Sequence, residues 1–564
     1  MKRIITLISI LSLAIALHAQ DSLQREVTII KDFTPIVRDA EKINSLPPIN
    51  TPHFERRTVQ YSFNAVPAHI ASQPSIVEMP FSPRDVASKK MPRGYALFSL
   101  GSYLSMAANA GYHIVDTPND QLNAALQFTS IDGDIPINSH ADGVNEETTR
   151  QTFYDTRVGL HYAHKFHNNL SWSINGAYRF LHFNYYGVTG VQLPTMPSHP
   201  TQQVHNFFAE MQVDNKQAAQ YDFEHWLIKA GYSLYSNRNG AYTPQPSQEH
   251  HAYINGYYQH MLNNKWSAGA HVNINYLQYN GILPTGSEAT INTLPSTQHI
   301  FMASILPHLQ WQTSRANFTI GAKVDISAGD GVLFRFAPEM RFNWEFVENY
   351  FLFIEASGGK QLHTWNSVSQ HCFYFDPSQR IPSSYSPFDG QLGLRMHIIP
   401  ELSLTLYGGY EAAKEALFQS LGYSPQTLTW RTLDAQCIKA GVRIDAHMGE
   451  YLKLSAQTAY RAWQHDGFQI SYNRPRWEAD AQLSIFPIKQ VDVDIAYHMA
   501  LGRVYDNNTS LNDIHNLQAT IKYRPLEWLS VHIQGDNLLN RAHDYYYGVP
   551  APRIQIMGGI AVKF

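Results

Sequence analysis

From Gly94 onward, the chain is a series of short runs in which apolar and polar residues alternate. In residues 266–276 the even positions hold Trp, Ala, Val, Ile and Tyr, whereas the odd positions hold Ser, Gly, His and Asn. Alternation with a period of two is typical of a β-strand that has one apolar face. The same pattern recurs in residues 451–460, 477–485, 490–497, 517–523 and 529–533. These runs predict an all-β chain.

Charged side chains in these runs share a face with glycine, serine and amides. Glu478 and Asp480 lie on the polar face of one run, and Asp492 and Asp494 on that of the next. A charge that faces lipid costs about 2–4 kcal/mol at the membrane midplane, so membrane-spanning strands must turn such residues inward. We expect these four carboxylates to form a charge cluster in a barrel lumen, where they bias a pore toward cations. The alternative is that they only fill the lumen with polar groups.

Tight polar connections between the runs alternate with longer ones. The tight connections are 166–170, 262–265, 312–316, 347–350, 400–401, 447–450, 487–490 and 524–527. The longer ones lie near 132–151, 186–204, 281–297, 363–387, 415–428, 465–474, 505–513 and 540–551. Short periplasmic turns opposite longer extracellular loops are the arrangement of outer-membrane β-barrels. The pattern predicts a transmembrane antiparallel barrel over residues 94–564 with about 22 strands, in a range of about 16–22.

One irregularity interrupts this pattern. Between Cys437 and Ile438 the apolar positions change from odd to even, which predicts a β-bulge or marks an error in that run.

The last run is amphipathic and ends the chain. Its apolar face is formed by Ile554, Ile556, Gly558, Ile560, Val562 and Phe564. A barrel must close its last strand against its first, because an open sheet edge cannot exist in lipid. We therefore expect Ile560, Val562 and Phe564 to act as a barrel-closing C-terminal signal.

The residues before Gly94 differ from the runs that follow. Lys2 and Arg3 precede an apolar stretch that is shorter than the roughly 20 residues of a spanning helix, which predicts a signal peptide over residues 1–19. Residues 20–93 contain nine prolines and little alternation. Because prolines at this density favour extended conformations, we expect a Pro-rich periplasmic or lumenal extension.

Composition agrees with a membrane barrel and excludes other classes. Only 16% of residues are charged and 13% are aromatic, as expected for strands whose apolar and polar faces average out. The formal net charge of −4 argues against a nucleic-acid partner. The two cysteines, Cys372 and Cys437, are too few and too far apart to form a disulfide framework.

The sequence contains no recognisable catalytic constellation, so we expect neither an enzyme nor a cofactor. It lacks a nucleophile elbow and a phosphate-binding glycine loop. Its histidine groups do not predict a metal site, because in a strand adjacent residues, and residues three apart, face opposite ways. Asp132 and Asp134 match the first ligand positions of a calcium-binding loop, but the later ligand positions of such a loop are missing. The histidines considered are His161, His164, His167, His250 and His251.

The C-terminal residues resemble the end of a TonB-dependent receptor. The resemblance is carried by 536–540 (DNLLN), 545–550 (YYYGVP) and the terminal strand 558–564, and residues 94–101 also look like plugless barrels of this type. It implies a barrel that takes up solutes. Residues Glu26, Val27, Thr28, Ile29 and Ile30 resemble the family's energy-coupling box, although five-residue matches are common by chance.

The chain departs from this family at its N-terminus. At most about 75 residues separate the predicted cleavage site after residue 19 from the first strand, whereas the resemblance implies a plug of about 130 residues or more. A barrel of about 22 strands normally has a plugged lumen. The lumen could be filled by residues 20–93, by loops that fold inward, or by another protein.

Two functional hypotheses follow from the sequence. The first is an outer-membrane barrel for solute uptake or passage. The second is a scaffold or assembly barrel that binds partner proteins and transports nothing. Both place the chain in the outer membrane and imply contact with membrane lipid, the barrel-insertion machinery and, for the scaffold, a periplasmic or outer-membrane protein. Neither the substrate nor coupling to TonB can be derived from the residues.

Overall fold

The computed structural model of the 564-residue chain contains one large β-sheet. The residues that it describes are 92–137, 148–166, 170–186, 201–215, 224–239, 246–282, 296–370, 372–421, 428–465, 474–504, 510–546 and 549–564. Its long strands are β1 (Gly94–Gly101), β2 (Met106–Asp116), β3 (Asp120–Pro136), β4 (Thr148–Lys165), β5 (Ser171–Asn184), β6 (Thr201–Asp214), β7 (Glu224–Asn237), β8 (Ser247–Met261), β9 (Trp266–Ile282), β10 (Ser296–Gln312), β11 (Ala316–Ala328), β12 (Phe334–Val347), β13 (Tyr350–Gln361), β14 (Ser384–Ile399), β15 (Leu402–Leu421), β16 (Leu428–Met448), β17 (Leu452–His465), β18 (Trp477–Ile488), β19 (Val491–Leu501), β20 (Ile514–Leu526), β21 (Leu529–Asp536) and β24 (Gln555–Lys563). The short elements are η2 (Ser102–Leu104), α2 (Trp365–Ser369), β22 (Asp544–Tyr546) and β23 (Val549–Pro550).

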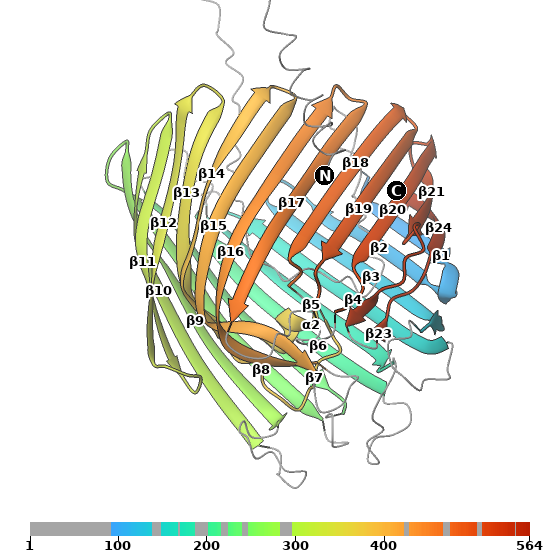
Figure 1. The fold of residues 1–564 in the computed structure, drawn as a ribbon, viewed down its shortest axis with the longest axis horizontal. Helices are drawn as coiled ribbons and strands as arrows, with labels where there is room; N and C mark the ends of the chain where they lie inside the picture. The colour runs from blue at the N-terminus through green and yellow to red at the C-terminus, as the bar shows by residue number, and fades with distance from the viewer. Residues whose placement is uncertain are drawn as a thin grey trace, which may run out of the picture. The chain divides into compact units, whose positions relative to one another are not determined.

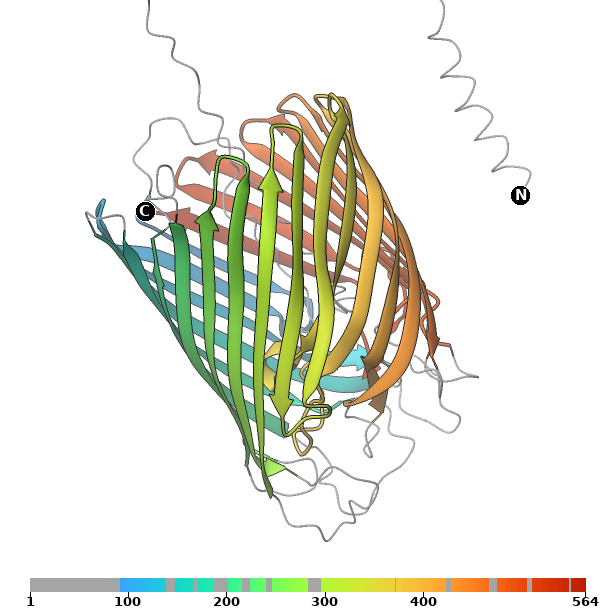
Figure 2. The same cartoon turned by 90° about the vertical axis from the view of Figure 1, so that its left-hand side faces the viewer.

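The sheet closes on itself as a 22-stranded antiparallel barrel. Each long strand pairs with the next along the chain, and β24 pairs with β1, with Phe98 opposite Ile560 and Ala96 opposite Val562. The backbone groups of Gly94 and Phe564 exchange two hydrogen bonds of 2.8 and 2.9 Å. The predicted fold class and strand number are therefore confirmed. Figure 1 and Figure 2 show the strands as one inclined ring.

The connections separate onto two rims as predicted. All eight tight connections lie at the rim where β1 begins and β24 ends, and all eight longer ones lie at the opposite rim. Alternation did not reveal five other connections: 102–105, 117–119, 215–223, 238–246 and 329–333. We call the two rims the short-turn rim and the long-loop rim, which face the periplasm and the exterior in an outer-membrane barrel.

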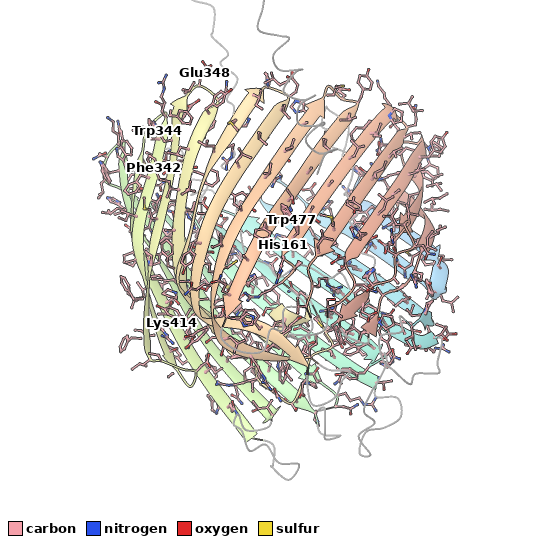
Figure 3. All side chains as sticks on the ribbon, in the orientation of Figure 1. His161, Phe342, Trp344, Glu348, Lys414 and Trp477 are labelled. Carbon is pink, nitrogen blue, oxygen red and sulfur yellow. The ribbon has the colours of Figure 1, made fainter. Side chains whose placement is uncertain are left out.

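The outer face of the barrel is apolar and the inner face polar. Along β24, the outward-facing Ile556 and Ile560 are each 52% exposed, whereas the inward-facing Gln555 is 2% exposed. Aromatic residues mark both ends of the outer face. Figure 3 shows Trp344 and Phe342 on β12 below Glu348, which lies in a turn of the short-turn rim. An apolar band between aromatic girdles is the outer surface of a membrane barrel.

The predicted bulge between Cys437 and Ile438 is wrong. The pairing of β16 with β17 is continuous through both residues, and the register shift lies on β15, between Ala413 and Ala416. Cys437 faces inward and Ile438, 58% exposed, faces outward. Toward the long-loop rim the inner face itself becomes apolar, since Ala435 packs in an interior cluster. The apolar positions change parity because the lumen is apolar there, and the strand itself is regular.

Among the described residues, no helix is both long and apolar enough to cross a membrane. The expected signal peptide, the Pro-rich extension and the coupling box at residues 26–30 lie outside the described residues, and they stay predictions.

Candidate functional site in the barrel lumen

The connection between β13 and β14 folds into the lumen. It contains α2, and Trp365, Val368 and Phe373 in it are at most 5% exposed. These residues belong to one buried cluster that includes inner-face residues of β3 to β7, β9 and β10, and residues of the loops after β19 and β21. Figure 1 and Figure 2 show α2 inside the ring, toward the long-loop rim. We call residues 362–383 the lumenal loop.

The start of α2 is fixed by a capping box and by a glutamate on the barrel wall. The hydroxyl of Thr364 accepts a hydrogen bond from the backbone N–H of Ser367, whose own hydroxyl accepts one from the backbone N–H of Thr364. The carboxylate of Glu249, on β8, accepts hydrogen bonds from the backbone N–H groups of Trp365 at 2.6 Å and Asn366 at 3.5 Å. Free N–H groups at a helix start attract an anion. Glu249 therefore ties α2 to the wall.

Two further polar contacts hold α2 against β4 to β6. The guanidinium of Arg179 donates to both carboxylate oxygens of Asp155 at 2.9 Å, and it also donates to the hydroxyl of Ser369 at 3.4 Å. The amide of Asn206 donates to Asn366 at 2.6 Å. Arg179 and Asp155 are almost completely buried. Because a buried charge is costly unless it is paired, Asp155 compensates the charge of Arg179 at the point where Arg179 contacts the loop.

Aromatic side chains form the apolar part of the docking contact. The ring of Phe373 lies 4.8 Å from the rings of Phe153 on β4 and Phe183 on β5. Tyr374 lies 5.8 Å from Tyr186 and 6.0 Å from Tyr546. Offset and edge-on pairs of this kind contribute about 0.5–1.5 kcal/mol each beyond the area that they bury.

A second segment, which contains β22 and β23, packs beside the lumenal loop. The hydroxyl of Tyr186 donates to the carbonyl of Pro550 at 3.0 Å. The guanidinium of Arg503, 1% exposed, donates to the carbonyl of Tyr545 at 2.6 Å. Burial lowers the pKa of Arg503 to about 10, so the group stays charged at neutral pH. The two segments together fill lumen space near the long-loop rim.

Burial shifts the pKa of several groups in these segments. It lowers the pKa of His363 to about 4, with a smaller contribution from Arg474. It likewise lowers the pKa of His543 to about 4, here with help from Arg503. It raises the pKa of Asp376 and takes that of the Cys372 thiol to about 12. The docked segments therefore hold neutral imidazoles at neutral pH.

The four carboxylates of the predicted charge cluster lie on neighbouring inner faces, and each has a partner. Glu478 and Asp480 are on β18, Asp492 and Asp494 on β19. Four contacts satisfy them: Arg461 to Glu478 at 2.7 Å, His498 to Asp480 at 2.7 Å, Arg524 to Asp492 at 2.8 Å, and Ser484 to Asp494. Glu478, Asp480 and His498 are also the group of His, Cys, Asp and Glu side chains that come close enough to hold an ion, among the described residues. Glu478 already forms an ion pair with Arg461, and this pair disfavours the binding of a metal cation at the group.

The structure places the other sequence candidates apart from one another. His161 bonds Asn175, and His164 lies 2.7 Å from Asp120. His250 bonds the outer-face Tyr232, whereas His251 bonds Asn275 on the inner face. Asp132 pairs with Arg150 at 2.9 Å, His167 lies outside the described residues, and both cysteines are free.

The barrel-closing residues lie where alternation places them. Ile560, Val562 and Phe564 are on the outer face of β24, and the ring of Phe564 stacks on Tyr112 of β2 at 6.0 Å. Whether they act as an insertion signal stays a prediction.

Sequence reasoning did not single out the residues of the lumenal loop. One signal was available. Residues 372–375 (CFYF) stand in a predicted extracellular loop, and four apolar residues in a row within a loop must find a buried site or remain an exposed patch.

No protein-family model and no curated protein sequence matches the chain. Solved structures do match its fold. The siderophore receptor PirA from Acinetobacter baumannii is 9% identical, with a TM-score of 0.65 over 85% of this chain and 81% of that one. The FrpB iron transporter from Neisseria meningitidis is 8% identical, with a TM-score of 0.64 over 84% and 82%. The copper transporter OprC is 10% identical, with a TM-score of 0.59 over 84% of each chain. The chain therefore has the closed 22-stranded barrel fold of the TonB-dependent receptors of the outer membrane.

Proposed function

We propose that the chain is an outer-membrane uptake receptor whose lumen is closed from outside by its own lumenal loop. The observation that carries this proposal is the docking of the lumenal loop on the wall, where Glu249 and Arg179 hold α2 and the ring of Phe373 packs on Phe153. A solute would pass only after these contacts are broken. The resemblance to siderophore, iron and copper receptors supports passage of a solute, although each of those substrates belongs to its own protein.

The contacts of the loop suit a removable closure. Its apolar anchor is a compact group of rings, while its polar anchors are hydrogen bonds to side chains of the wall. No covalent link holds it among the described residues, since Cys372 is a free thiol. A ligand that contacts the long-loop rim could therefore release the loop by competing for a few hydrogen bonds.

Ion-current recordings in planar bilayers test the proposal. We expect the wild-type protein to conduct little, and Trp365→Ala to raise both conductance and open time because it removes the central buried ring of α2. The matched control is Trp344→Ala on the outer face of β12, which should leave the current unchanged. Equal currents from wild type and Trp365→Ala, at equal protein insertion, would contradict the proposal.

The same recordings test the charge cluster on β18 and β19. We propose that it biases the open lumen toward cations, which the reversal potential under a salt gradient measures. Asp480→Asn and Asp494→Asn should move that potential toward the value of a nonselective pore. A scaffold without transport would instead stay closed when Trp365 is replaced, and crosslinking would recover a stoichiometric protein partner.

A further inference from the structure

One sector of the barrel wall is nearly free of charge. β9 and β10 contain no Asp, Glu, Lys or Arg, and β8 contains only Glu249. On the opposite part of the sheet, β17 to β20 turn residues such as Arg461, Glu478 and Asp492 inward. The lumen therefore has a neutral sector on β8 to β10.

Four rings lie in contact in a row on this sector; the first pair is edge-on, the second is tilted and the third is stacked. His225 of β7 lies 5.2 Å from Tyr257 of β8, which lies 4.6 Å from His271 of β9. His271 lies 5.2 Å from His308 of β10, and the rings of Tyr257 and His308 are nearly parallel, with an interplanar angle of 10°. All four side chains are half-buried and share the inward parity of Leu277 and Ile300, which pack in the lumenal cluster.

Glycines of neighbouring strands stand beneath the ring of His308 and beneath that of Tyr253, farther along β8. A β-carbon built on Gly269 would come within 2.7 Å of the ring of His308, and one built on Gly231 would overlap the ring of Tyr253. A ring that covers a glycine of the neighbouring strand presents its other face to the lumen. We call the residues His225, Tyr257, His271 and His308 the ring platform.

A line of amides and hydroxyls holds the platform in place. The hydroxyl of Tyr257 donates to Gln259, whose amide donates to Ser267 at 2.8 Å and to Gln310 at 3.0 Å. The amide of Gln310 donates onward to Asn317 at 3.4 Å. These bonds fix the edge of the Tyr257 ring, so the Tyr257 side chain loses little conformational entropy when a ligand stacks on it.

The platform continues along β8 toward the lumenal loop. Tyr257 stands four residues from the end of β8 at the short-turn rim. Closer to the long-loop rim on the same strand, the rings of Tyr253 and His251 lie 5.3 Å apart, and His251 bonds Asn275 at 3.0 Å. The next inward residue is Glu249, which holds α2. The rings thus line one wall from the lumenal loop toward the short-turn rim.

We propose that this ring platform binds neutral oligosaccharides. The inference rests on the proposed uptake function and names its substrate class. The apolar faces of sugar rings pack on aromatic side chains, while hydroxyl groups pair with amides and imidazoles, which both donate and accept hydrogen bonds. An anionic solute finds no cation on β8 to β10, and the nearest inward charges, Glu210, Lys229 and the Glu339–Arg341 pair, offset one another in part.

Saturation-transfer NMR and equilibrium titration of the full-length protein in detergent test the platform. The probes are maltohexaose, cellohexaose and xylohexaose, with the anion 2,3-dihydroxybenzoate as a contrast. We expect at least one hexasaccharide to bind and Tyr257→Ala to weaken it about tenfold. Tyr257→Phe, which keeps the ring, should retain most of the affinity. The matched control Tyr258→Ala removes the adjacent outer-face ring and should change nothing.

The measurement is repeated on Trp365→Ala, so that a closed loop cannot hide a site. The proposal is overturned if no hexasaccharide binds to either protein, if Tyr257→Ala binds as tightly as wild type, or if only the dihydroxybenzoate binds. Current recordings separate this failure from failure of the uptake proposal. An open Trp365→Ala barrel whose current no hexasaccharide reduces would refute the platform and leave uptake standing.

Discussion

At the residue scale, the lumenal loop depends on a few side chains that are far apart in sequence. Glu249 lies more than 110 positions before α2, and its carboxylate is the partner of two N–H groups at the helix start. No local pattern reveals such a contact, because a glutamate on the inner face of a strand looks like any lumenal polar residue. Its role is visible only after the barrel brings β8 beside the loop.

Glu249→Ala should loosen the loop. It leaves two N–H groups of the helix start without their acceptor, which costs about 1–3 kcal/mol and corresponds to a roughly 5- to 150-fold larger population of the open loop. Hydrogen exchange of the amides in residues 362–383 measures this opening. Glu249→Gln, which keeps an acceptor, should have a smaller effect. Glu348→Ala at the short-turn rim is the control. If the three variants exchange at the same rate as the wild type, the assigned role is refuted.

Acid should also release the lumenal loop, which contains His363, and the second segment beside it, which contains His543. Burial holds the pKa of His363 and His543 at about 4, below the ordinary value of about 6.5. Between these two values the released state binds more protons than the docked state. Docking is therefore fully stabilised above pH 6.5, and it weakens as the pH falls toward 4 by up to about 3 kcal/mol for each imidazole.

The raised pKa of Asp376 opposes this trend, because it favours docking at low pH. Conductance or proteolysis of the loop between pH 7 and 4 measures the sum. His363→Gln should flatten the profile. A loop that stays docked down to pH 4 in the wild type would show that the imidazoles do not control it.

At the element scale, periodicity predicted the strands and both kinds of turn but not what fills the lumen. Alternation reports which side of a strand is apolar, and this was sufficient for β24 and β20, whose inner faces meet polar surroundings. It failed on β16, where the inward-facing Ala435 packs in an apolar cluster and the buried Cys437 also faces inward, so that apolar residues stand at the inner positions. It also gave the β13–β14 connection as a plain loop, since the wall contacts of α2 are with strands far away in the sequence, from β4 to β9.

The two faces of one strand should differ sharply in their tolerance of charge. Ile521 on the outer face of β20 is 53% exposed, and Thr520 beside it faces inward opposite Asp494. Ile521→Lys should destabilise the barrel by about 2–4 kcal/mol, whereas Thr520→Lys should be nearly neutral. Urea unfolding in lipid vesicles measures both. If the two variants lose equal stability, the assignment of faces on β20 is wrong.

At the scale of the whole molecule, sequence reasoning gave the closed barrel and its approximate strand number. It left open whether the lumen was filled by residues 20–93, by inward loops or by another protein. The described residues show inward loops near the long-loop rim. That outcome depends on the curvature of the wall, which brings inner-face residues of β3 to β7, β9 and β10 into one cluster with the connections after β13 and β21, and no local pattern encodes that curvature.

The pairing of Tyr95 with Lys563 has a consequence for how the protein is made. The edge of β1 can form its backbone hydrogen bonds only after β24, the last strand, has been synthesised. Contacts of such long sequence separation form slowly. Until then the nascent wall offers two unpaired edges to any neighbour. Biogenesis must therefore shelter almost the entire polypeptide, and a chain that lost only its final strand would remain a permanently open, aggregation-prone sheet.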